Sequence, residues 1–553
     1  MSRGTLWIVL VAICASGITG CGGGSGTNPP PAPPPVQSQN FTFYVSGLAF
    51  DGTGDNADVD PYDIAGVVAI DMDGSGKVVA GEQDYGDGDR IASPEPQGDV
   101  IMSGSLTMQT NGQGTLTLVT NNSQLGISGT ETFAVAFYNA NHALITQFDG
   151  SATSSGSLDL QTSTATPSGA FSFVASGLGG GDLAPIVEGG VFTVDASGNV
   201  TGMGDMSQGG QVTRGTAIPA GATLSVPDSF GRGTVTTDSI IFGTLSYYTV
   251  GPKVFRIIET ELDASAVGSA YSQGTHPTFT NASIGKSAFS VGQGFDFYAA
   301  GGQFTTDPAA TATFTGVGDV NQLFGALLPS AAIGGTYSLG ANGYGTMTFN
   351  PIGSSPGFGD IVTLGVYAVD PTLNILDPNN TTNTAGAGGA LLAEMDTNLA
   401  GIGLLIPQTD VTPADFTGAY TFGAQGRTSL NPDEFDFVGQ ATVTAAKFAG
   451  SGALNDLFGD LTGTAGQFPN VTFTGTATPD TDNPGRFTFT PLALSSAGFT
   501  SPVDATIVVY QANAGQLFSV QIDKTVESGG SLQQSTFAPA AGARPAKPST
   551  LDH

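Results

Sequence analysis

Residues 111–117 read Asn-Gly-Gln-Gly-Thr-Leu-Thr, and residues 342–348 read Asn-Gly-Tyr-Gly-Thr-Met-Thr. Related stretches stand at 231–236 (Gly-Arg-Gly-Thr-Val-Thr) and 483–488 (Asn-Pro-Gly-Arg-Phe-Thr). Asn-Gly and Gly-x-Gly supply the positive φ angles of tight hairpin turns, and alternating Thr and apolar residues are typical of a half-buried strand. The same hairpin therefore occurs four times, which indicates an all-β protein built from a repeated module.

Three further features recur in the same order around this hairpin. An aromatic strand opens each module at 41–48, 171–178, 289–291 and 420–422, and a Gly-rich stretch follows at 81–84, 202–208, 316–325 and 450–459. Each module then closes with an Asp (Asp149, Asp263, Asp396, Asp523) and a Gln (Gln161, Gln273, Gln408, Gln534). These features place the β-modules at 41–162, 168–275, 285–409 and 416–535, and each is long enough to own a core.

The turn spacing predicts the fold of a module. Within 168–275 the sequence predicts nine short strands and no helix, at 171–176, 190–195, 200–203, 211–217, 223–226, 233–237, 240–250, 254–261 and 268–273. Consecutive hairpins form a meander, and a meander of about eight strands hides its edges by closing into a barrel. We expect four tandem antiparallel β-meander domains that resemble up-and-down β-barrels, with a two-sheet β-sandwich as the alternative.

Composition excludes some classes of partner. The 553 residues include 46 Asp and Glu against 14 Lys and Arg, a net charge of −32, so binding to nucleic-acid phosphates is not expected. With 34 Phe and 39% hydrophobic residues, the chain is too apolar for a disordered acidic polymer.

The amino terminus reads as a delivery signal. Arg3 precedes an apolar run at 6–14, and the segment 18–21, Ile-Thr-Gly-Cys, resembles the lipobox of bacterial lipoproteins. The resemblance implies that 1–20 is a signal peptide, that Cys21 carries lipid, and that this lipid attaches the protein to a membrane. Gly22 after the cysteine implies, by the same resemblance, an outer-membrane or cell-surface location.

The segments flanking the modules differ from them in composition. Residues 21–40 form a Gly/Pro-rich stalk, in which six prolines favour an extended chain. Residues 536–553 are rich in Ala and Pro and are predicted to be disordered. The repeated body resembles tandem-repeat surface lipoproteins of environmental bacteria, a resemblance that implies no activity.

No catalytic residues are predicted. His142 in a hairpin turn, His276 in a linker and His553 at the end occupy unrelated repeat positions, and no Gly-x-Ser-x-Gly motif occurs. Ser283 and Lys286 have the Ser-x-x-Lys spacing of some serine hydrolases, but the match is isolated and is attributed to chance. The recurrent aspartates are interpreted as turn residues, because a catalytic site rarely appears four times in one chain.

One acidic segment is a candidate metal site. Asp51, Asp55, Asp58, Asp60 and Asp63 lie close together in the first module. Oxygen-rich loops of this kind suit Ca²⁺, which accepts six to eight oxygen ligands. The alternative is a solvated acidic loop, because module two lacks these acids.

The sequence favours a lipid-anchored cell-envelope protein whose β-domains have a non-catalytic binding, adhesion or structural role. Its partner would be an envelope polymer or a surface protein, and the ligand-binding residues are unknown. Two alternatives stay open: an extracytoplasmic carboxylate-dependent hydrolase, and a small-ligand carrier that uses the barrel interiors.

Overall fold

The computed structural model describes residues 38–50, 59–71, 74–87, 98–179, 184–237, 243–259, 264–275, 278–293, 298–309, 312–351, 357–379, 387–429 and 434–537. The signal peptide, Cys21 and the stalk up to residue 37 lie outside this range. In the described part, the only helical elements are two 3₁₀ turns, η1 (Asn281–Ser283) and η2 (Pro413–Asp415). None of its helices is long and apolar enough to cross a membrane.

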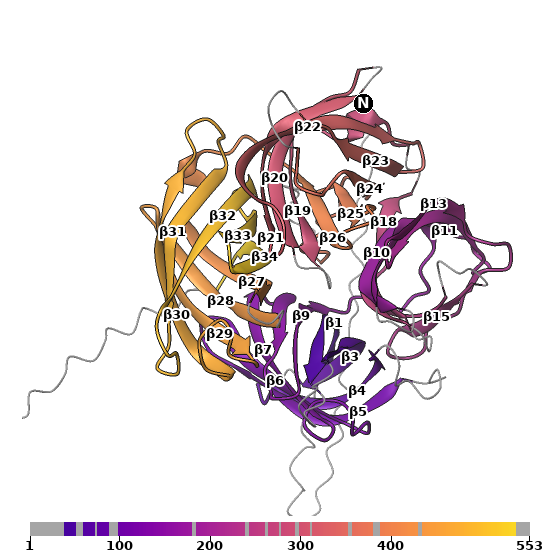
Figure 1. The fold of residues 1–553 in the computed structure, drawn as a ribbon. Helices are drawn as coiled ribbons and strands as arrows, with labels where there is room; N and C mark the ends of the chain where they lie inside the picture. The colour runs from indigo at the N-terminus through magenta and orange to yellow at the C-terminus, as the bar shows by residue number, and fades with distance from the viewer. Residues whose placement is uncertain are drawn as a thin grey trace, which may run out of the picture. The chain divides into compact units, whose positions relative to one another are not determined.

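The first half of the chain forms two sheets, which we call barrels 1 and 2 (Figure 1). Barrel 1 consists of β1 (Ser38–Phe50), β2 (Val59–Pro61), β3 (Asp63–Asp71), β4 (Lys77–Gly86), β5 (Asp99–Met108), β6 (Gln113–Thr120), β7 (Thr130–Asn139), β8 (His142–Gln147) and β9 (Ala152–Leu160). Its ends close because β1 pairs with β9. Barrel 2 consists of β10 (Gly169–Gly179), β11 (Ala184–Val194), β12 (Val200–Gln208), β13 (Gln211–Ala217), β14 (Thr223–Leu224), β15 (Arg232–Thr236), β16 (Thr244–Gly251), β17 (Val254–Glu259) and β18 (Ala264–Gly274). It is a curled sheet in which β10 pairs with β18.

The second half forms two closed antiparallel barrels of eight strands each. Barrel 3 consists of β19 (Ser287–Gln293), β20 (Tyr298–Asp307), β21 (Thr313–Gln322), β22 (Leu327–Leu339), β23 (Tyr344–Phe349), β24 (Thr363–Ala368), β25 (Ala390–Glu394) and β26 (Ile402–Pro407). Barrel 4 consists of β27 (Gly418–Thr428), β28 (Glu434–Thr444), β29 (Lys447–Asp456), β30 (Gly466–Pro479), β31 (Arg486–Ser495), β32 (Val503–Asn513), β33 (Gln516–Asp523) and β34 (Val526–Gln534). The predicted barrel fold is confirmed, and a β-sandwich is not observed.

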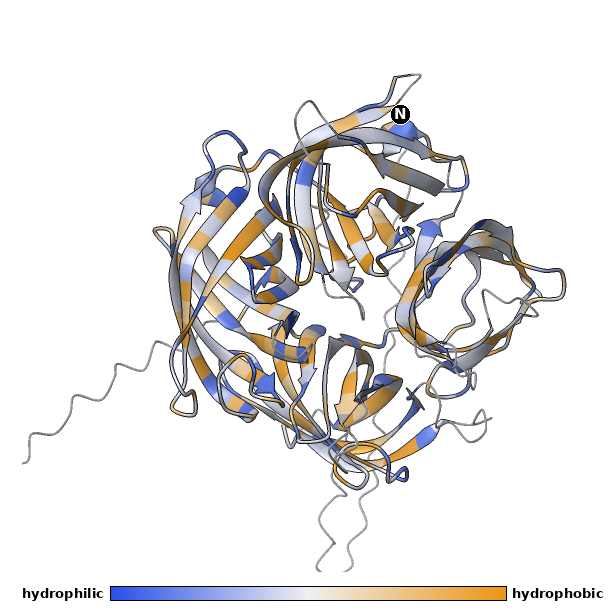
Figure 2. Ribbon diagram, in the orientation of Figure 1, coloured by the Kyte–Doolittle hydropathy of each residue, from blue (hydrophilic) through white to orange (hydrophobic). Residues whose placement is uncertain are grey.

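Alternation along the strands builds one core inside each barrel. In β23 the side chains of Met347 and Phe349 are buried, while Thr346 and Thr348 between them are half-buried. Figure 2 shows the resulting bands of hydrophobic and hydrophilic residues along the strands. Aromatic side chains dominate the interiors: in barrel 4 the ring of Phe422 lies 4.9 Å from that of Phe437 and 4.9 Å from that of Phe473, edge to face.

The barrels contact one another in a closed cycle. The first strands of barrel 1 pack on the last three strands of barrel 2, and the same relation joins barrels 2 and 3 and barrels 3 and 4. Strands β27 and β28 of barrel 4 then pack on β7–β9 of barrel 1. Every contact is therefore head-to-tail, the type of contact that closes into a ring when the rotation permits. Residues 37–553 accordingly form one compact unit.

This cycle explains why some strands are buried on both faces. Every residue of β10 from Phe171 onward is buried, and β3 is buried from Asp63 to Ile70. One face of such a strand covers the core of its own barrel, and the other face covers a neighbouring barrel. The strands that pack between barrels therefore lack the alternation that marks β23.

The chain leaving barrel 4 docks on barrel 1. Thr409, after barrel 3, donates its backbone N–H to the carbonyl of Ala512 in barrel 4 over 2.9 Å. Thr536, after barrel 4, donates in the same way to the carbonyl of Tyr138 in barrel 1 over 2.7 Å. Phe537 then packs against the core of barrel 1. The first two residues of the predicted disordered tail thus serve as a clasp, and residues 538–553 lie outside the described range.

Candidate functional site

A charged cluster is buried between barrels 3 and 4. Asp319 on β21 is fully buried, and it accepts hydrogen bonds from Arg486 Nε at 2.9 Å and Nη2 at 2.8 Å. The hydroxyl of Tyr510 and the backbone N–H of Ser330 also donate to it. Burial, strengthened by the Asp319 charge, raises the pKa of Tyr510 well above its usual range. The carboxylate is therefore paired in a bidentate manner and fully coordinated by the protein.

Related clusters join the two preceding pairs of barrels. Between barrels 1 and 2, Asp84 accepts from Arg232 Nε and Nη2 and from the Tyr248 hydroxyl, each at 2.8 Å. Between barrels 2 and 3, Asp205 accepts from the hydroxyls of Tyr344 at 2.6 Å and Tyr367 at 2.7 Å. Arg232 and Arg486 thus each neutralise an aspartate of the neighbouring barrel.

The contact that closes the cycle is built differently. The residues of the charged cluster have counterparts at the contact between barrels 4 and 1, identified by repeat position and strand register. Ala453 takes the place of Asp319, Gln113 that of Arg486 and Ala136 that of Tyr510. Ala136 and Ala453 pack with Val438 in an apolar cluster. Gln113 donates to the carbonyl of Ser451 over 2.7 Å. A neutral trio therefore replaces the charged one at the single contact that is not bridged by a linker between modules.

The repeated closing residues have structural roles. The closing glutamines donate from Nε2 to backbone carbonyls of the next barrel: Gln161 to Thr249 at 2.9 Å, Gln273 to Ala368 at 3.2 Å and Gln408 to Gln511 at 2.7 Å. The recurrent aspartates accept backbone N–H groups of their own barrel at 2.9 Å: Asp149 from Thr132, Asp396 from Thr363 and Asp523 from Thr506. These contacts support a structural interpretation of both residues, and Asp263 lies outside the described residues.

All four barrels contribute to one cavity of about 160 Å³, which we call the shared cavity. Polar side chains from barrels 1 and 2 line part of it, including Tyr44, His142 and Arg256. Apolar side chains line the remainder, among them Ile402 and Leu404 of barrel 3. The cavity is therefore amphipathic.

The charged group in its wall is Arg256, whose side chain is 3% exposed. Arg256 Nη2 donates to Asp159, and His142 Nδ1 is hydrogen-bonded to the other oxygen of the same carboxylate. Burial acts to raise the pKa of Asp159, but Arg256 and His142 outweigh it and hold that pKa below its usual range. The guanidinium carbon also lies 4.7 Å from the ring centroid of Tyr44, a cation–π contact. Arg256 also donates hydrogen bonds from Nη1 and Nη2 to the hydroxyls of Ser157, Ser269 and Tyr271.

This cluster does not have the hydrogen-bond order of a serine hydrolase. In such enzymes the serine bonds to the histidine, and the histidine bonds to the aspartate. Here Ser157 donates to Asp159 over 2.8 Å, in place of a bond to His142. His142 itself is the first residue of β8, not a turn residue as predicted, and its side chain is buried.

A long loop between β24 and β25 lies against the shared cavity. Its residues Ile375 and Leu376 line the cavity. Polar residues of the loop (Asp370, Asn374 and Asp377) accept hydrogen bonds from Lys253 of barrel 2 at 2.7 Å, Gln516 of barrel 4 at 2.6 Å and Asn139 of barrel 1 at 3.0 Å. One loop of barrel 3 therefore contacts the three other barrels.

The sequence analysis predicted no role for Arg256 or for this loop, although an unusual sequence feature marks each of them. Arg256 stands within Val-Phe-Arg-Ile-Ile (254–258), an unusual place for one of only 14 basic residues. The loop begins after Ala368, where the corresponding hairpins have short turns such as 139–142 and 513–516.

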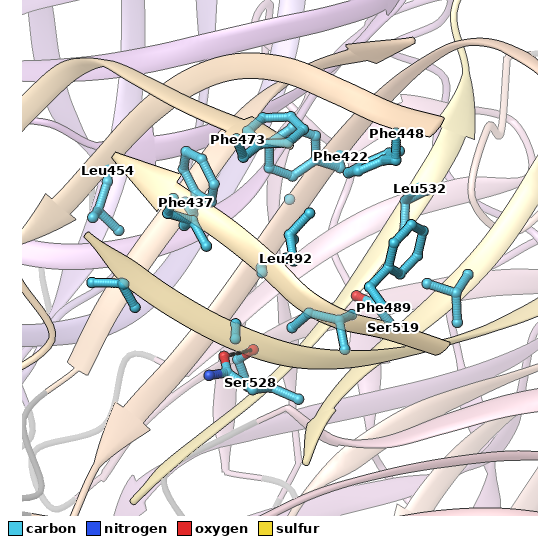
Figure 3. A pocket seen from close by; sticks show the side chains of 18 of the residues that line it. Phe422, Phe437, Phe448, Leu454, Phe473, Phe489, Leu492, Ser519, Ser528 and Leu532 are labelled. Carbon is cyan, nitrogen blue, oxygen red and sulfur yellow. Dashed lines mark hydrogen bonds between the residues drawn. The ribbon is translucent and has the colours of Figure 1, made fainter. Parts of the chain in front are cut away.

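A second cavity lies inside barrel 4 and has a volume of about 80 Å³. Phenylalanine and leucine side chains surround it, and Ser519 and Ser528 provide polar groups at one side (Figure 3). Ser528 donates a hydrogen bond of 3.0 Å to Gln521, another lining residue. This space is half the volume of the shared cavity, and its lining is almost entirely apolar with no charged side chain, so we interpret it as a gap in the core of barrel 4.

The candidate calcium residues are only partly described. Asp51, Asp55 and Asp58 lie outside the described residues. Asp60 is buried, and Asp63 accepts a hydrogen bond from Ser265 of barrel 2 at 2.6 Å. Burial raises the pKa of Asp63 to about 7. Within the described ranges, no three His, Cys, Asp or Glu residues are grouped to hold a metal ion.

Comparison with known proteins yields no family. No protein-family model and no curated protein matches the chain. Among solved structures, a mutant of Transferrin Binding Protein B from Haemophilus parasuis Hp5 is 11% identical, with 89% of this chain and 95% of that chain covered and a TM-score of 0.20. The intact Ap-TbpB with its N and C lobes is 7% identical, with coverage of 90% and 76% and a TM-score of 0.15. The ferric citrate transporter FecA is 10% identical, with coverage of 88% and 66% and a TM-score of 0.11. Likeness at these TM-scores supports no argument about function.

Proposed function

We propose that this protein is a lipid-anchored component of a cell envelope with a non-catalytic binding, adhesion or structural role. The observation that carries the proposal is the use of its charged residues. Arg232 and Arg486 are 9% and 7% exposed, and each neutralises an aspartate of a neighbouring barrel. These buried ion pairs thus stabilise the contacts between barrels. A rigid assembly of barrels is suited to a binding or structural role.

The envelope location rests on the amino-terminal sequence. Cys21 within its lipobox-like segment would carry the lipid. The stalk would separate the barrels from the membrane, and it would end at residue 37, because residues 38–40 of the predicted stalk belong to β1. An envelope polymer or a surface protein is the proposed partner.

Membrane fractionation of cells that express the full chain tests the anchor. We expect the wild-type protein in the membrane fraction and the Cys21→Ala variant in the soluble fraction, with metabolic labelling by a fatty acid lost in the variant. Cys14→Ala is the matched control and should leave both fractionation and labelling unchanged. A soluble wild-type protein would refute the anchor.

The hydrolase alternative gains no support from the described carboxylates. Burial raises the pKa of Glu131 and of Glu527 to about 8, which is the behaviour of a proton donor. Neither residue lines a cavity described above, and the lining of both cavities contains no Asp or Glu among the described residues.

A further inference from the structure

Three buried polar atoms of residues that line the shared cavity have no hydrogen-bond partner in the protein. They are Nε2 of His142 and Nε of Arg256, which belong to the charged cluster, and Oγ1 of Thr146. His142 is 3% exposed and Arg256 is 2% exposed. Because leaving a buried polar group unsatisfied is destabilising, such atoms usually mark a missing water, ion or ligand.

The proton arrangement of this cluster restricts the chemistry of a ligand. His142 Nδ1 faces ionised Asp159, so it carries a proton, and Nε2 is then an acceptor in neutral histidine or a donor in the imidazolium. Arg256 Nε is a donor only. A carboxyl group has the hydrogen-bonding chemistry that His142 Nε2 and Arg256 Nε call for: the neutral acid donates to a neutral Nε2 and accepts from Arg256, and the carboxylate accepts from the imidazolium and from Arg256.

The apolar side chains that line the rest of the cavity favour a ligand whose other end is a hydrocarbon. Val174, Leu391, Ile402 and Leu404 line the cavity beside the polar cluster. The volume of about 160 Å³ is close to that of an engineered cavity of about 150 Å³ that binds benzene. A ligand of this size has a short hydrocarbon tail.

We propose that the shared cavity binds a small monocarboxylic acid, with its carboxyl group at His142 and Arg256 and its short hydrocarbon tail against the barrel 3 side chains. The β24–β25 loop covers the bound acid through Ile375 and Leu376. The site depends on all four barrels being assembled, because each barrel contributes to its lining.

Calorimetric titration of the chain from residue 22 onward with butyrate, in a buffer free of carboxylates, tests the proposal. n-Butanol and n-butylammonium serve as probes of similar size without the carboxyl group. We expect butyrate to bind at least about tenfold more tightly than n-butanol, because a hydrogen bond to a charged group contributes more than a neutral one. Equal affinities for butyrate and n-butanol would overturn the proposal.

Two variants separate the site from non-specific binding. His142→Leu removes the unsatisfied nitrogen and should weaken butyrate binding at least about tenfold. Leu404→Trp leaves the charged cluster intact, fills the cavity and should abolish binding. Ser519→Ala in barrel 4 is the control and should bind as wild type does. Circular dichroism verifies the fold of each variant, and full butyrate affinity in folded Leu404→Trp would place the acid elsewhere and refute the proposal.

Discussion

The cluster of Asp319, Arg486 and Tyr510 permits a quantitative test of how the barrels are held together. Arg486→Gln leaves the fully buried Asp319 carboxylate without its cation. Removing one partner of a buried ion pair costs about 3–5 kcal/mol, because the remaining charge is desolvated and unpaired. We expect the free energy of unfolding to fall by about this amount.

The double variant Asp319→Ala/Arg486→Gln should be more stable than the single one. It removes the buried charge as well, and it copies Ala453 and Gln113, which form the natural contact between barrels 4 and 1. The double variant leaves only neutral donors, the Tyr510 hydroxyl and the Ser330 N–H, without their acceptor, and these cost less than an unpaired buried charge. We therefore expect it to lose less stability than Arg486→Gln.

Urea unfolding followed by far-ultraviolet circular dichroism measures both effects, and midpoints are compared only where the slopes agree. Lys253→Gln is the control: its ion pair with Asp370 involves a side chain that is 48% exposed, so the change should cost less than about 1 kcal/mol. If the double variant is as unstable as Arg486→Gln, the unpaired Asp319 charge is not the source of the loss and the reasoning fails.

Three further predictions concern the tail, the pH and calcium. Deleting 536–553 removes Phe537 from the core of barrel 1 and should lower the Tm, whereas deleting 538–553 should not; equal Tm values would show that the clasp is not stabilising. Because burial raises the pKa of Glu131 to about 8, the folded state binds more protons than the unfolded state between about pH 4.5 and 8, so stability should fall as the pH rises through this window. Thermal scans should show a higher Tm at pH 5 than at pH 9, and Glu131→Gln should reduce that difference; an unchanged difference contradicts the assignment. If the acidic segment 51–63 binds Ca²⁺, adding Ca²⁺ should raise the Tm and a chelator should reverse the rise, whereas an unchanged Tm rejects calcium.

The strands were predictable because turn chemistry is local. In barrel 2 the strand predicted at 211–217 matches β13, and the hairpin glycine Gly231 adopts the positive φ that its turn demands. The strand predicted to begin at 190 instead begins at Ala184, because Gly189 and Gly190 lie inside β11. A Cβ on Gly189 would lie 2.3 Å from the ring of Tyr367 in barrel 3. Gly189 thus permits the close approach of a neighbouring barrel, and this is a long-range constraint that local sequence does not reveal.

The shared cavity was not predictable for the same reason. Arg256 and Asp159 are 97 residues apart and come from different modules. Comparing the repeats revealed which residues recur, and His142 and Arg256 do not recur. Their meeting depends on the packing of one module against another, which periodicity within a module does not encode.

The head-to-tail order of the barrels has a consequence for how the chain folds. Strands β7–β9 of barrel 1 lie near the start of the chain, whereas their partner surface on β27 and β28 follows roughly 260 residues later, so barrel 1 can form before that surface does. During this interval Ala134, Ala136 and Leu144 have no cover. The neutral, small-residue composition of this surface suits such a delay, since it leaves no unpaired buried charge while barrel 1 waits for barrel 4.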